Sequence, residues 1–428
     1  MYFSLMQGFQ RSQVDTLVSR LNEQPRRIIA VFGPRQTGKT RLVHQALHRT
    51  GRHPLYYTLD QMDAAEPEDL VFAGQTLALA EQTLRMPKMP DAEWLVRAWQ
   101  QARQAAERHP HGAVLALDEI QTLPQWSSAV KGLWDADRAV GRNLHVIILG
   151  SAPLLMQSGL TESLAGRFEP IDVRHWSYQE MADAFNFDLA EYIYFGGYPG
   201  GAHLIREEER WRNYILNALI TPNIERDIVA MTKVEKPALL KQLFELGADY
   251  SGQILSYSKM RGQLEDAGNA TTLARYLDLL ATAGLISGLA RYSTSSHQVR
   301  ASSPKLNVLN TALATAKSGY TFTQAQADRT FWGRLVESAV GAHILNSAPN
   351  NVHAYYWRQS HLEVDFVLSR GPLTIAIEVK SGRRRPLPGM DAFSRQFKPH
   401  RTMLIGDGGT PLDDFLTSSL DRWFGKDP

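Results

Sequence analysis

The sequence predicts an α/β fold, and three observations point to that class. Apolar runs of strand length alternate with amphipathic stretches of helical period over the first part of the chain. One run, residues 28–32, leads directly into a glycine-containing turn that opens a helix. Later in the chain, an amphipathic helix precedes two apolar runs joined by a short turn. Because a single hydrophobic core rarely grows past roughly 250–300 residues, we expect two or three domains in these 428 residues.

Composition excludes several classes of protein. Hydrophobic residues make up 43% of the chain and charged residues 21%, which is ordinary for a soluble globular protein. No apolar run reaches the ~18 residues that cross a bilayer, and the N-terminus lacks a signal-peptide pattern. We therefore expect a cytoplasmic protein with no membrane partner. The absence of cysteine excludes disulfides and thiolate metal sites, and a net charge of +2 leaves any nucleic-acid surface to a local patch.

Residues 31–40 read VFGPRQTGKT and contain the pattern G-x-x-x-x-G-K-[ST] of a phosphate-binding loop. Gly33 and Gly38 stand at the two ends of a turn whose amides must point at a polyphosphate. Lys39 would then reach the β- and γ-phosphates, while the hydroxyl of Thr40 would bind Mg²⁺. The expected cofactors are ATP and Mg²⁺.

Two acids follow a later strand. A strand predicted over 54–60 and a helix over 92–107 precede the apolar run 113–117, which ends in Asp118 and Glu119. Asp118 would hold the Mg²⁺ shell, and Glu119 would orient or deprotonate the attacking water. The simpler alternative is an Asp-Glu pair that only opens a helix.

Two further candidates follow the next predicted strands. The strand over 144–149 ends at Gly150 and Ser151, where the hydroxyl of Ser151 could sense the γ-phosphate, cap the following helix, or do both. Arg167 lies on a glycine-containing loop before the fifth strand, over 168–173. It could complete a neighbouring subunit's site as an arginine finger or form a surface ion pair. A finger role predicts a homo-oligomer such as a ring.

These segments together resemble a prokaryotic AAA+ ATPase. The resemblance rests on the phosphate-binding loop, on DEIQTLPQW over 118–126, on the strand ending in Gly-Ser, and on SLAGR over 163–167. The later segments resemble one subgroup, whose C-terminal half is described only as a domain of unknown function: FGGYPG over 195–200, IERDI over 224–228 and FWGRLVE over 331–337. The resemblance implies an AAA+ core, a winged-helix domain in the middle and a nuclease-like fold at the end.

The middle of the chain predicts a helix-turn-helix followed by a two-stranded wing. One helix begins within 255–260, and a second covers 271–283 and is closed by Gly284. The strands of the wing are predicted over 285–292 and 299–309. Residues 234–300 contain seven Lys or Arg and six Asp or Glu, so no basic stripe marks a DNA-binding surface. This region could therefore contact either DNA or another protein.

The C-terminal region predicts a helix and a hairpin. The helix covers 332–345, and the strands cover 362–368 and 374–380, with a turn of about five residues between them.

Four charged residues on these elements predict a second chemical site. Glu378 and Lys380 share a face of their strand because side chains alternate, and Asp365 can meet them from the partner strand. Two carboxylates on Mg²⁺ beside a lysine can activate water and neutralise the charge of a phosphoryl displacement. A structural ion pair between Glu378 and Lys380 is the alternative. Glu337 lies on the preceding helix.

The order helix-borne Glu, Asp, then Glu-x-Lys resembles the PD-(D/E)xK nuclease superfamily. The resemblance implies that Asp365 and Glu378 are metal ligands, that Lys380 is the water-orienting cation, and that Glu337 is a further acid near the metal. Val364 stands where the superfamily's name has Pro, at a position that carries no chemistry.

A basic run surrounds this predicted site. Residues 370–401 contain eight basic residues and only two acidic ones. The basic residues are Arg370, Lys380, Arg383, Arg384, Arg385, Arg395, Lys398 and Arg401. The triplet Arg383, Arg384 and Arg385 could bind DNA phosphates without reading sequence, or form a solvated loop.

The predicted domains are an AAA+ core (1–185), a helical lid or linker (186–233), a winged helix (234–310) and a restriction-endonuclease-like α/β domain (311–428). We expect a Mg²⁺-dependent ATPase that couples ATP binding and hydrolysis to DNA binding and cleavage. The alternative is a nucleotide-switched regulatory or assembly protein whose nuclease-like domain only binds nucleic acid or protein.

Overall fold

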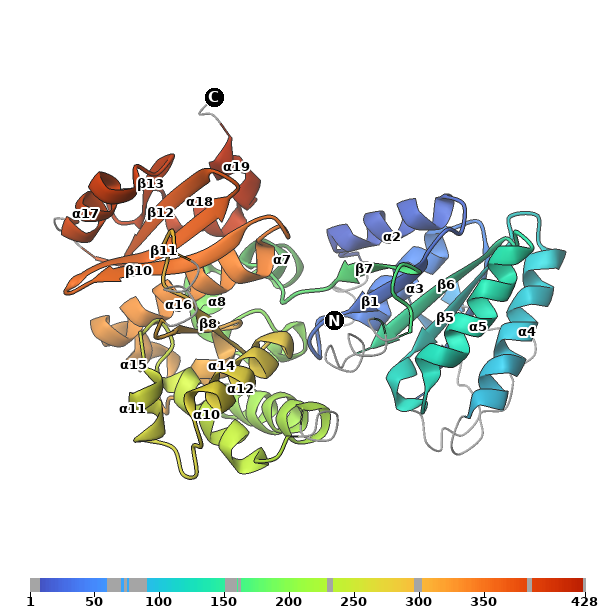
Figure 1. Ribbon diagram of the computed structural model, residues 1–428, viewed down its shortest axis with the longest axis horizontal. Coiled ribbons are helices and arrows are strands. Elements are labelled where there is room, and N and C mark those ends of the chain that lie inside the picture. The colour runs from blue at the N-terminus through green and yellow to red at the C-terminus, as the bar shows by residue number, and fades with distance from the viewer. Residues whose placement is uncertain are drawn as a thin grey trace. The chain divides into compact units, whose positions relative to one another are not determined.

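The computed structural model describes residues 8–59, 91–150, 160, 163–228, 234–295, 302–382 and 387–425, together with two short strands at 71–72 and 75–76. The chain forms two compact units, Met1–Val173 and Arg174–Pro428 (Figure 1). The finer division into a lid, a winged helix and a nuclease-like domain stays a prediction. Within the described ranges, no helix is both long and apolar enough to cross a membrane.

The first unit is built on a five-stranded parallel sheet. Its strand order is β2 (His53–Thr58), β5 (Ala113–Asp118), β6 (Leu144–Gly150), β1 (Ile28–Phe32) and β7 (Phe168–Asp172). Both β5 and β6 are buried over their whole length, as expected of parallel strands whose two faces are covered by helices. The predicted α/β class is therefore confirmed, and the core of this unit is a parallel sheet.

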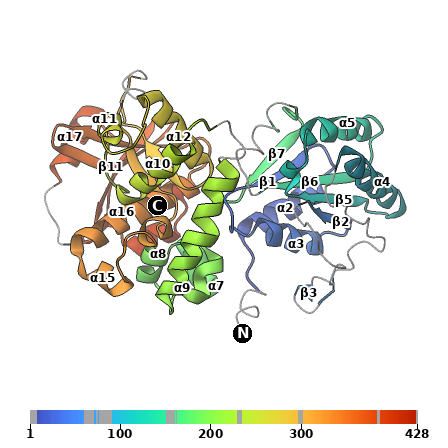
Figure 2. The ribbon, with the colours of Figure 1, turned by 90° about the horizontal axis from the view of Figure 1, so that it is seen from below.

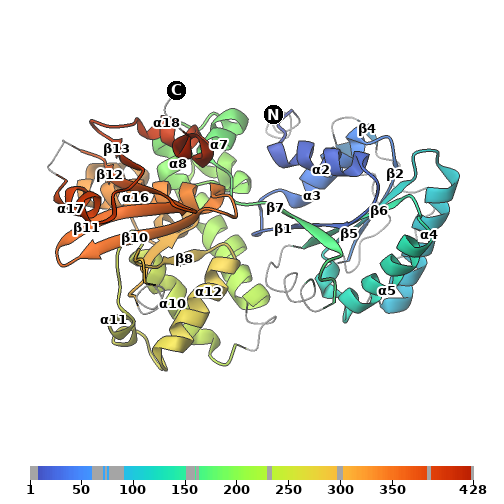
Figure 3. The same ribbon diagram turned by 45° about the horizontal axis from the view of Figure 1, so that its top comes forward.

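Two helices cover each face of this sheet (Figures 2 and 3). The helices α2 (Ser12–Asn22) and α3 (Lys39–Arg49) pack on one face, and α4 (Ala92–Arg108) and α5 (Trp126–Ala139) pack on the other. Each helix turns an apolar stripe inward; on α4 this stripe includes Trp94 and Trp99, which are fully buried. The remaining short elements are η1 (Ile120–Thr122), β3 (Val71–Phe72) and β4 (Gln75–Thr76).

The second unit begins with a run of helical segments. They are α7 (Tyr178–Phe185), α8 (Leu189–Phe195), η2 (Pro199–Leu204), α9 (Glu208–Asn213), η3 (Tyr214–Ile220) and η4 (Asn223–Ile228). The next three helices are α10 (Pro237–Asp249), α11 (Tyr257–Arg261) and α12 (Ala270–Thr282). Side-chain caps begin both α11 and α12: Ser256 accepts from the amide of Lys259, and Asn269 accepts from that of Thr272.

A two-stranded antiparallel sheet follows α12. It consists of β8 (Ile286–Leu289) and β9 (Lys305–Val308), and both α10 and α16 contact β9. The helices that follow are α14 (Ala312–Thr315), α15 (Phe322–Ala327) and α16 (Arg329–Ser347). All four residues of β9 are buried, including the polar Lys305 and Asn307. Because alternate residues share a face, these two side chains point together, and both contact α16.

The chain ends in a four-stranded mixed sheet. Its order is β10 (His353–Gln359), β11 (Leu362–Arg370), β12 (Leu373–Lys380) and β13 (Arg401–Gly406), with only β12 and β13 parallel. Its helices are α17 (Pro388–Phe397), α18 (Leu412–Thr417) and α19 (Leu420–Phe424). The predicted hairpin of β11 and β12 is confirmed, but its turn is shorter than predicted, because pairing continues to Arg370 and Leu373.

We predict that Gly341→Ala destabilises the second unit. A Cβ at Gly341 would lie 2.2 Å from Oδ1 of Asn307. Asn307 is fully buried, and its amide donates to the carbonyls of Val308 and Ser338, so it has no room to retreat. Overpacking of this kind costs ~1–3 kcal/mol. Differential scanning calorimetry of the full chain should show a transition lowered by several degrees.

Gly132→Ala is the matched control. Gly132 lies on α5, and an added Cβ there meets nothing within 4 Å. Its replacement should leave stability unchanged or raise it by up to ~1 kcal/mol, because alanine is the better helix former. Equal transitions for both variants would contradict the close contact between α16 and β9.

Candidate functional site

The loop between β1 and α3 has the backbone that a phosphate-binding turn requires. Gly33 has φ +155°, and a Cβ there would lie 2.1 Å from the carbonyl oxygen of Val173, so no larger residue fits. Gly38 has φ +86° and precedes the first residue of α3. The positive end of the α3 dipole therefore faces the turn.

The loop holds its lysine inside the turn. Lys39 is 7% exposed, and its Nζ donates to the carbonyl oxygens of Gly33 (2.9 Å) and Pro34 (2.7 Å). The hydroxyl of Thr37 also donates to Pro34, at 2.9 Å. The guanidinium of Arg11 donates to the carbonyl of Thr37 at 3.1 Å, which ties the start of α2 to the loop. This arrangement places a buried cation where polyphosphate oxygens would bind.

The two predicted Mg²⁺ ligands lie side by side. The hydroxyl of Thr40 donates to Oδ2 of Asp118 at 2.8 Å, although the residues are 78 positions apart in the sequence. Oδ1 of Asp118 accepts the backbone amide of Glu119 at 2.9 Å. A hydroxyl and a carboxylate at this spacing are the oxygen ligands that Mg²⁺ takes beside nucleotide phosphates, so these residues fit the cofactor pair.

Glu119 stands directly after β5 in an uncommon backbone conformation. Its φ is +53°, in the left-handed region that few residues other than glycine adopt. Its carboxylate accepts the side-chain amide of Gln121. Strained positions of this kind concentrate at active sites.

Sequence reasoning missed Tyr56 on β2. Its hydroxyl donates to Oδ2 of Asp118, the oxygen that also accepts from Thr40. Its ring packs against His44, with centroids 4.2 Å apart. Burial, followed by the charge of Asp118, raises the pKa of Tyr56, so it remains a hydrogen-bond donor. The alternation of PLYYTLD marks this face of β2, but no sequence signal gives the register of β2 on β5.

The other predicted nucleotide residues have different outcomes. Ser151 lies outside the described residues. Arg167 forms a bidentate ion pair with Asp135 on α5, through Nε (2.8 Å) and Nη2 (2.9 Å). This is the surface ion pair that the sequence left open. An arginine-finger role stays a prediction and requires the pair with Asp135 to open.

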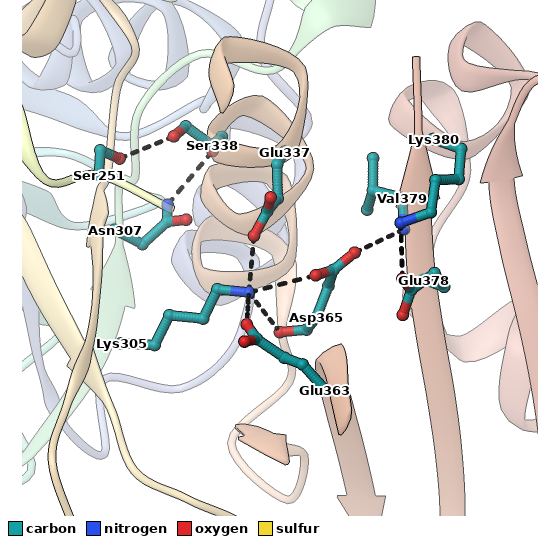
Figure 4. Close-up of polar contacts among 10 residues, drawn as sticks. All are labelled: Ser251, Lys305, Asn307, Glu337, Ser338, Glu363, Asp365, Glu378, Val379 and Lys380. Atoms are coloured by element: carbon teal, nitrogen blue, oxygen red, sulfur yellow. Dashed lines mark hydrogen bonds and ion pairs between the residues drawn. The ribbon is translucent and has the colours of Figure 1, made fainter. Parts of the chain in front are cut away.

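The C-terminal residues gather as predicted, but they bind protein groups (Figure 4). Lys380 Nζ lies 2.6 Å from Oε1 of Glu378, so these two residues form an ion pair on β12. Oδ2 of Asp365 accepts the backbone amide of Val379 at 2.8 Å. Among the described residues, no group of three or more His, Asp or Glu side chains is arranged to hold a metal ion. The triplet Arg383, Arg384 and Arg385 lies outside the described residues.

Lys305 is the second functional candidate that sequence reasoning missed. It is fully buried, and its Nζ lies 2.6 Å from Glu337 Oε1, 3.3 Å from Glu363 Oε1 and 3.4 Å from Asp365 Oδ1. The backbone carbonyl of Asp365 also accepts, at 3.2 Å. We call Glu337, Glu363 and Asp365 the carboxylate cluster. The only sequence signal was a lysine within the apolar run KLNVL.

Burial shifts the titration of this region. It raises the pKa of Glu337 to about 7, with the charge of Asp365 adding to the shift and Lys305 opposing it. Burial and Asp365 likewise raise the pKa of Glu378 to about 7, against the opposing effect of Lys380. Burial alone would lower the pKa of Lys305, but the surrounding carboxylates outweigh it and raise that pKa. Lys305 is therefore a permanent cation.

Three parts of the chain match known domain families. Residues 25–182 match an AAA domain, residues 186–324 match a domain of unknown function (DUF8612), and residues 332–416 match another (DUF4143). The first match covers the parallel sheet and both nucleotide motifs.

Curated relatives share part of this chain. An uncharacterized protein of Haemophilus influenzae is 28% identical over 188 residues, which are 41% of this chain and 45% of that protein. An uncharacterized protein of Mycobacterium tuberculosis is 26% identical over 272 residues, which are 62% of this chain and 58% of that protein. The chain thus spans about half the length of the curated relatives it matches.

Two solved structures are similar at low TM-scores. A Walker-type ATPase of Pyrococcus abyssi has a TM-score of 0.45 and 16% identity, covering 72% of this chain and 95% of that one. The RuvB Holliday junction branch migration motor of Thermotoga maritima has a TM-score of 0.32 and 14% identity, covering 66% and 89%. The match to an AAA domain and the geometry above show that the first unit has an AAA-like P-loop core, similar to those of ATPases.

We predict that Tyr56→Phe weakens ATP hydrolysis about tenfold and raises the Mg²⁺ concentration needed for half-maximal rate. The change removes a hydroxyl that orients Asp118, and the loss of such supporting contacts typically costs 10–100-fold in metal affinity or activity. Phosphate release assayed across a Mg²⁺ titration measures both effects.

Tyr57→Phe is the control for Tyr56→Phe. Its hydroxyl donates to Gln101 on α4, on the opposite face of β2 from Asp118. Its loss should leave the Mg²⁺ dependence unchanged. Identical Mg²⁺ curves for Tyr56→Phe and wild type would remove Tyr56 from the site.

Proposed function

We propose that this chain is a Mg²⁺-dependent ATPase that couples ATP binding and hydrolysis to the engagement of DNA by its second unit. The observation that carries the ATPase part is the 2.8 Å contact between Thr40 and Asp118, beside the buried Lys39. Two separate pieces of sequence supply these groups, because Lys39 and Thr40 are adjacent and Asp118 lies 78 positions after Thr40. Their convergence at one edge of a parallel sheet is the arrangement that nucleotide hydrolysis requires.

Each residue of the nucleotide site has a distinct task. Lys39 exchanges its contacts with two loop carbonyls for contacts with the β- and γ-phosphate oxygens, and so neutralises charge in the transition state. Thr40 and Asp118 hold Mg²⁺, which supplies positive charge at the phosphates. Glu119, aimed by its left-handed backbone, orients the attacking water and accepts its proton.

Arg167 gives the proposal an oligomeric form. In a homo-oligomer such as a ring, Arg167 of one subunit reaches the γ-phosphate bound to its neighbour. Asp135 holds the guanidinium until then. Exchange of Asp135 for a phosphate would link subunit assembly to hydrolysis.

The basic run over 370–401 supports DNA as the partner of the second unit. Its excess of six positive charges, counted from eight basic and two acidic residues, favours a polyanion. Two of its members already form ion pairs: Arg370 with Asp421, and Lys380 with Glu378. Contact with DNA therefore falls to the exposed Arg395 and Lys398 and to the triplet 383–385.

The same unit is better suited to binding DNA than to cutting it. Both carboxylate oxygens of Asp365 accept hydrogen bonds from protein groups, and the ammonium of Lys380 donates to Oε1 of Glu378. The winged-helix prediction is weakened as a DNA contact, because Lys305 and Asn307 of the second wing strand are buried. DNA cleavage is the second candidate, favoured by the gathering of Glu337, Asp365, Glu378 and Lys380, and it requires Lys305 to leave.

We predict that Lys39→Ala abolishes ATP binding and hydrolysis, and that Glu119→Gln binds ATP but turns over at least 10²-fold more slowly. General-base removal costs about 10²–10⁴ in rate, whereas the loop that binds phosphate stays intact. Nucleotide binding by fluorescence and phosphate release measure the two steps separately. Glu93→Gln, exposed on α4, is the control and should behave as wild type. Unchanged turnover in Glu119→Gln would exclude it as the base.

We predict that the chain binds labelled duplex DNA without cleaving it in Mg²⁺ or Mn²⁺, with or without ATP. Replacing Arg383, Arg384 and Arg385 together by Ala should weaken binding and reduce the salt dependence by about 2.7 in log–log slope, because each phosphate contact contributes ~0.9. Fluorescence anisotropy across a salt series measures both quantities.

Arg210→Ala, an exposed basic residue outside the run, is the control for DNA binding. Equal affinity of the triple variant and wild type would remove the triplet from the interface. Cleavage that disappears in Lys380→Ala while ATP hydrolysis persists would replace binding by the nuclease candidate.

A further inference from the structure

We propose that Lys305 is the resident cation of the carboxylate cluster and takes the place that a divalent metal would need there. The inference does not depend on the ATPase, which lies in the other unit. It concerns the metal that the PD-(D/E)xK resemblance implies for Asp365 and Glu378.

The ammonium of Lys305 is surrounded by acceptors (Figure 4). Four oxygens lie within 3.4 Å of Nζ, from Glu337, Glu363 and both the side chain and the backbone of Asp365. An ammonium has three N–H groups, and three hydrogen bonds use them: to Glu363 Oε1 and to the side chain and backbone of Asp365, while Glu337 is held as an ion pair. Mg²⁺ binds carboxylate oxygens at ~2.1 Å, so an ion between Glu337 and Asp365 would compete with Nζ for the same lone pairs.

The predicted metal ligands are engaged by the protein. Asp365 uses Oδ1 for Lys305 and Oδ2 for the amide of Val379. Glu378 uses Oε1 for Lys380. Oε2 of Glu378 and Oε1 of Glu337 are buried without a hydrogen-bond partner among the described residues, but Glu337 Oε1 forms an ion pair with the ammonium of Lys305 at 2.6 Å, and the remaining oxygen of Glu378 does not by itself make a metal site. The residues present therefore do not fit the implied metal while Lys305 is in place.

Further contacts fix the position of Lys305. It lies on β9, and Asn307 on the same face donates to the backbone carbonyl of Ser338 at 3.2 Å. The hydroxyls of Ser338 and Ser251 lie 2.7 Å apart, and Ser251 accepts the amide of Val308 at 3.1 Å. These contacts pin β9 to α16 around the lysine. Withdrawal of Lys305 would have to move the strand as well as the side chain.

The two cations are therefore mutually exclusive. A metal at Asp365 requires β9 to leave α16, and while β9 is docked the cluster carries its own positive charge. The second unit binds no divalent metal at these carboxylates, and removal of the ammonium creates a site for one.

Mn²⁺ binding by the nucleotide-free full chain tests this, measured by electron paramagnetic resonance and calorimetry. Wild type and Asp365→Asn should bind the same amount of Mn²⁺. Lys305→Ala should gain one Mn²⁺ site, which Lys305→Ala/Asp365→Asn lacks. Mn²⁺ should also raise the Tm of Lys305→Ala and leave that of wild type unchanged. Any binding at Asp118 is common to all four proteins and cancels in the comparison.

Lys380→Ala is the control for loss of a lysine, and it should gain no site because, within the part of the chain that the structure describes, its ammonium pairs with Glu378 and not with the carboxylate cluster. A folded Lys305→Ala that gains neither a Mn²⁺ site nor a Tm response would overturn the proposal. So would Mn²⁺ binding by wild type that Asp365→Asn removes. The latter comparison involves no Lys305 variant and decides the matter even where Lys305→Ala does not fold.

Discussion

The second unit depends on the buried ion pairs of one lysine. Lys305 is fully buried, and bringing an ammonium into a protein interior is costly unless opposite charges and hydrogen bonds surround it. Glu337 reaches it from α16, and Glu363 and Asp365 reach it from β11. Removal of Lys305 would leave three carboxylates close together without a counter-charge, so the lysine on β9 holds α16 and β11 in place. Apolar packing surrounds these elements, but the ion pairs of Lys305 determine that β9 faces α16.

The two acidic sites of the chain differ in what holds their carboxylates. Asp118 is held by neutral hydroxyls, from Thr40 and Tyr56. Asp365 is held by an ammonium, from Lys305. Neutral donors orient a carboxylate but leave its charge uncompensated, which is the condition under which Mg²⁺ binds. An ammonium satisfies the orientation and the charge together. The same residue type is therefore left with an uncompensated charge in one unit and is an ion-pair partner in the other.

Sequence analysis predicted most of the nucleotide site because its signals are local. The phosphate-binding loop is continuous in sequence, and a parallel sheet places the ends of β5 and β1 at the same edge, here with β6 between them, where Asp118 contacts Thr40. The alternation along β11 and β12 likewise predicted which side chains share a face. In contrast, Tyr56 depends on the register between β2 and β5, which side-chain alternation alone does not give.

The role of Lys305 could not be predicted from the sequence, for a different physical reason. A strand of period two with lysine and asparagine on one face normally turns that face to water. Here α16 and β11 cover it, and the covering carboxylates lie 32 to 60 positions later in the chain, at Glu337 and Asp365. A single sequence offers no way to pair groups at such separation. For Arg167 the sequence offered two roles, an arginine finger and a surface ion pair. It could not distinguish them, because both use the same exposed guanidinium.

The ion pairs of Lys305 also cross the boundary between two separately recognised regions. Lys305 belongs to the part matching DUF8612 (186–324), whereas Glu337 and Asp365 belong to the part matching DUF4143 (332–416). Separating these two regions would expose β9 and would leave Lys305 without its partners in one region and three carboxylates without a counter-charge in the other. The compact unit that begins at Arg174 spans both regions without a break. The two regions match separate families in sequence, but the ion pairs of Lys305 join them in the structure. The strand that carries Lys305 thereby connects the middle helices, α10 to α12, to the C-terminal sheet.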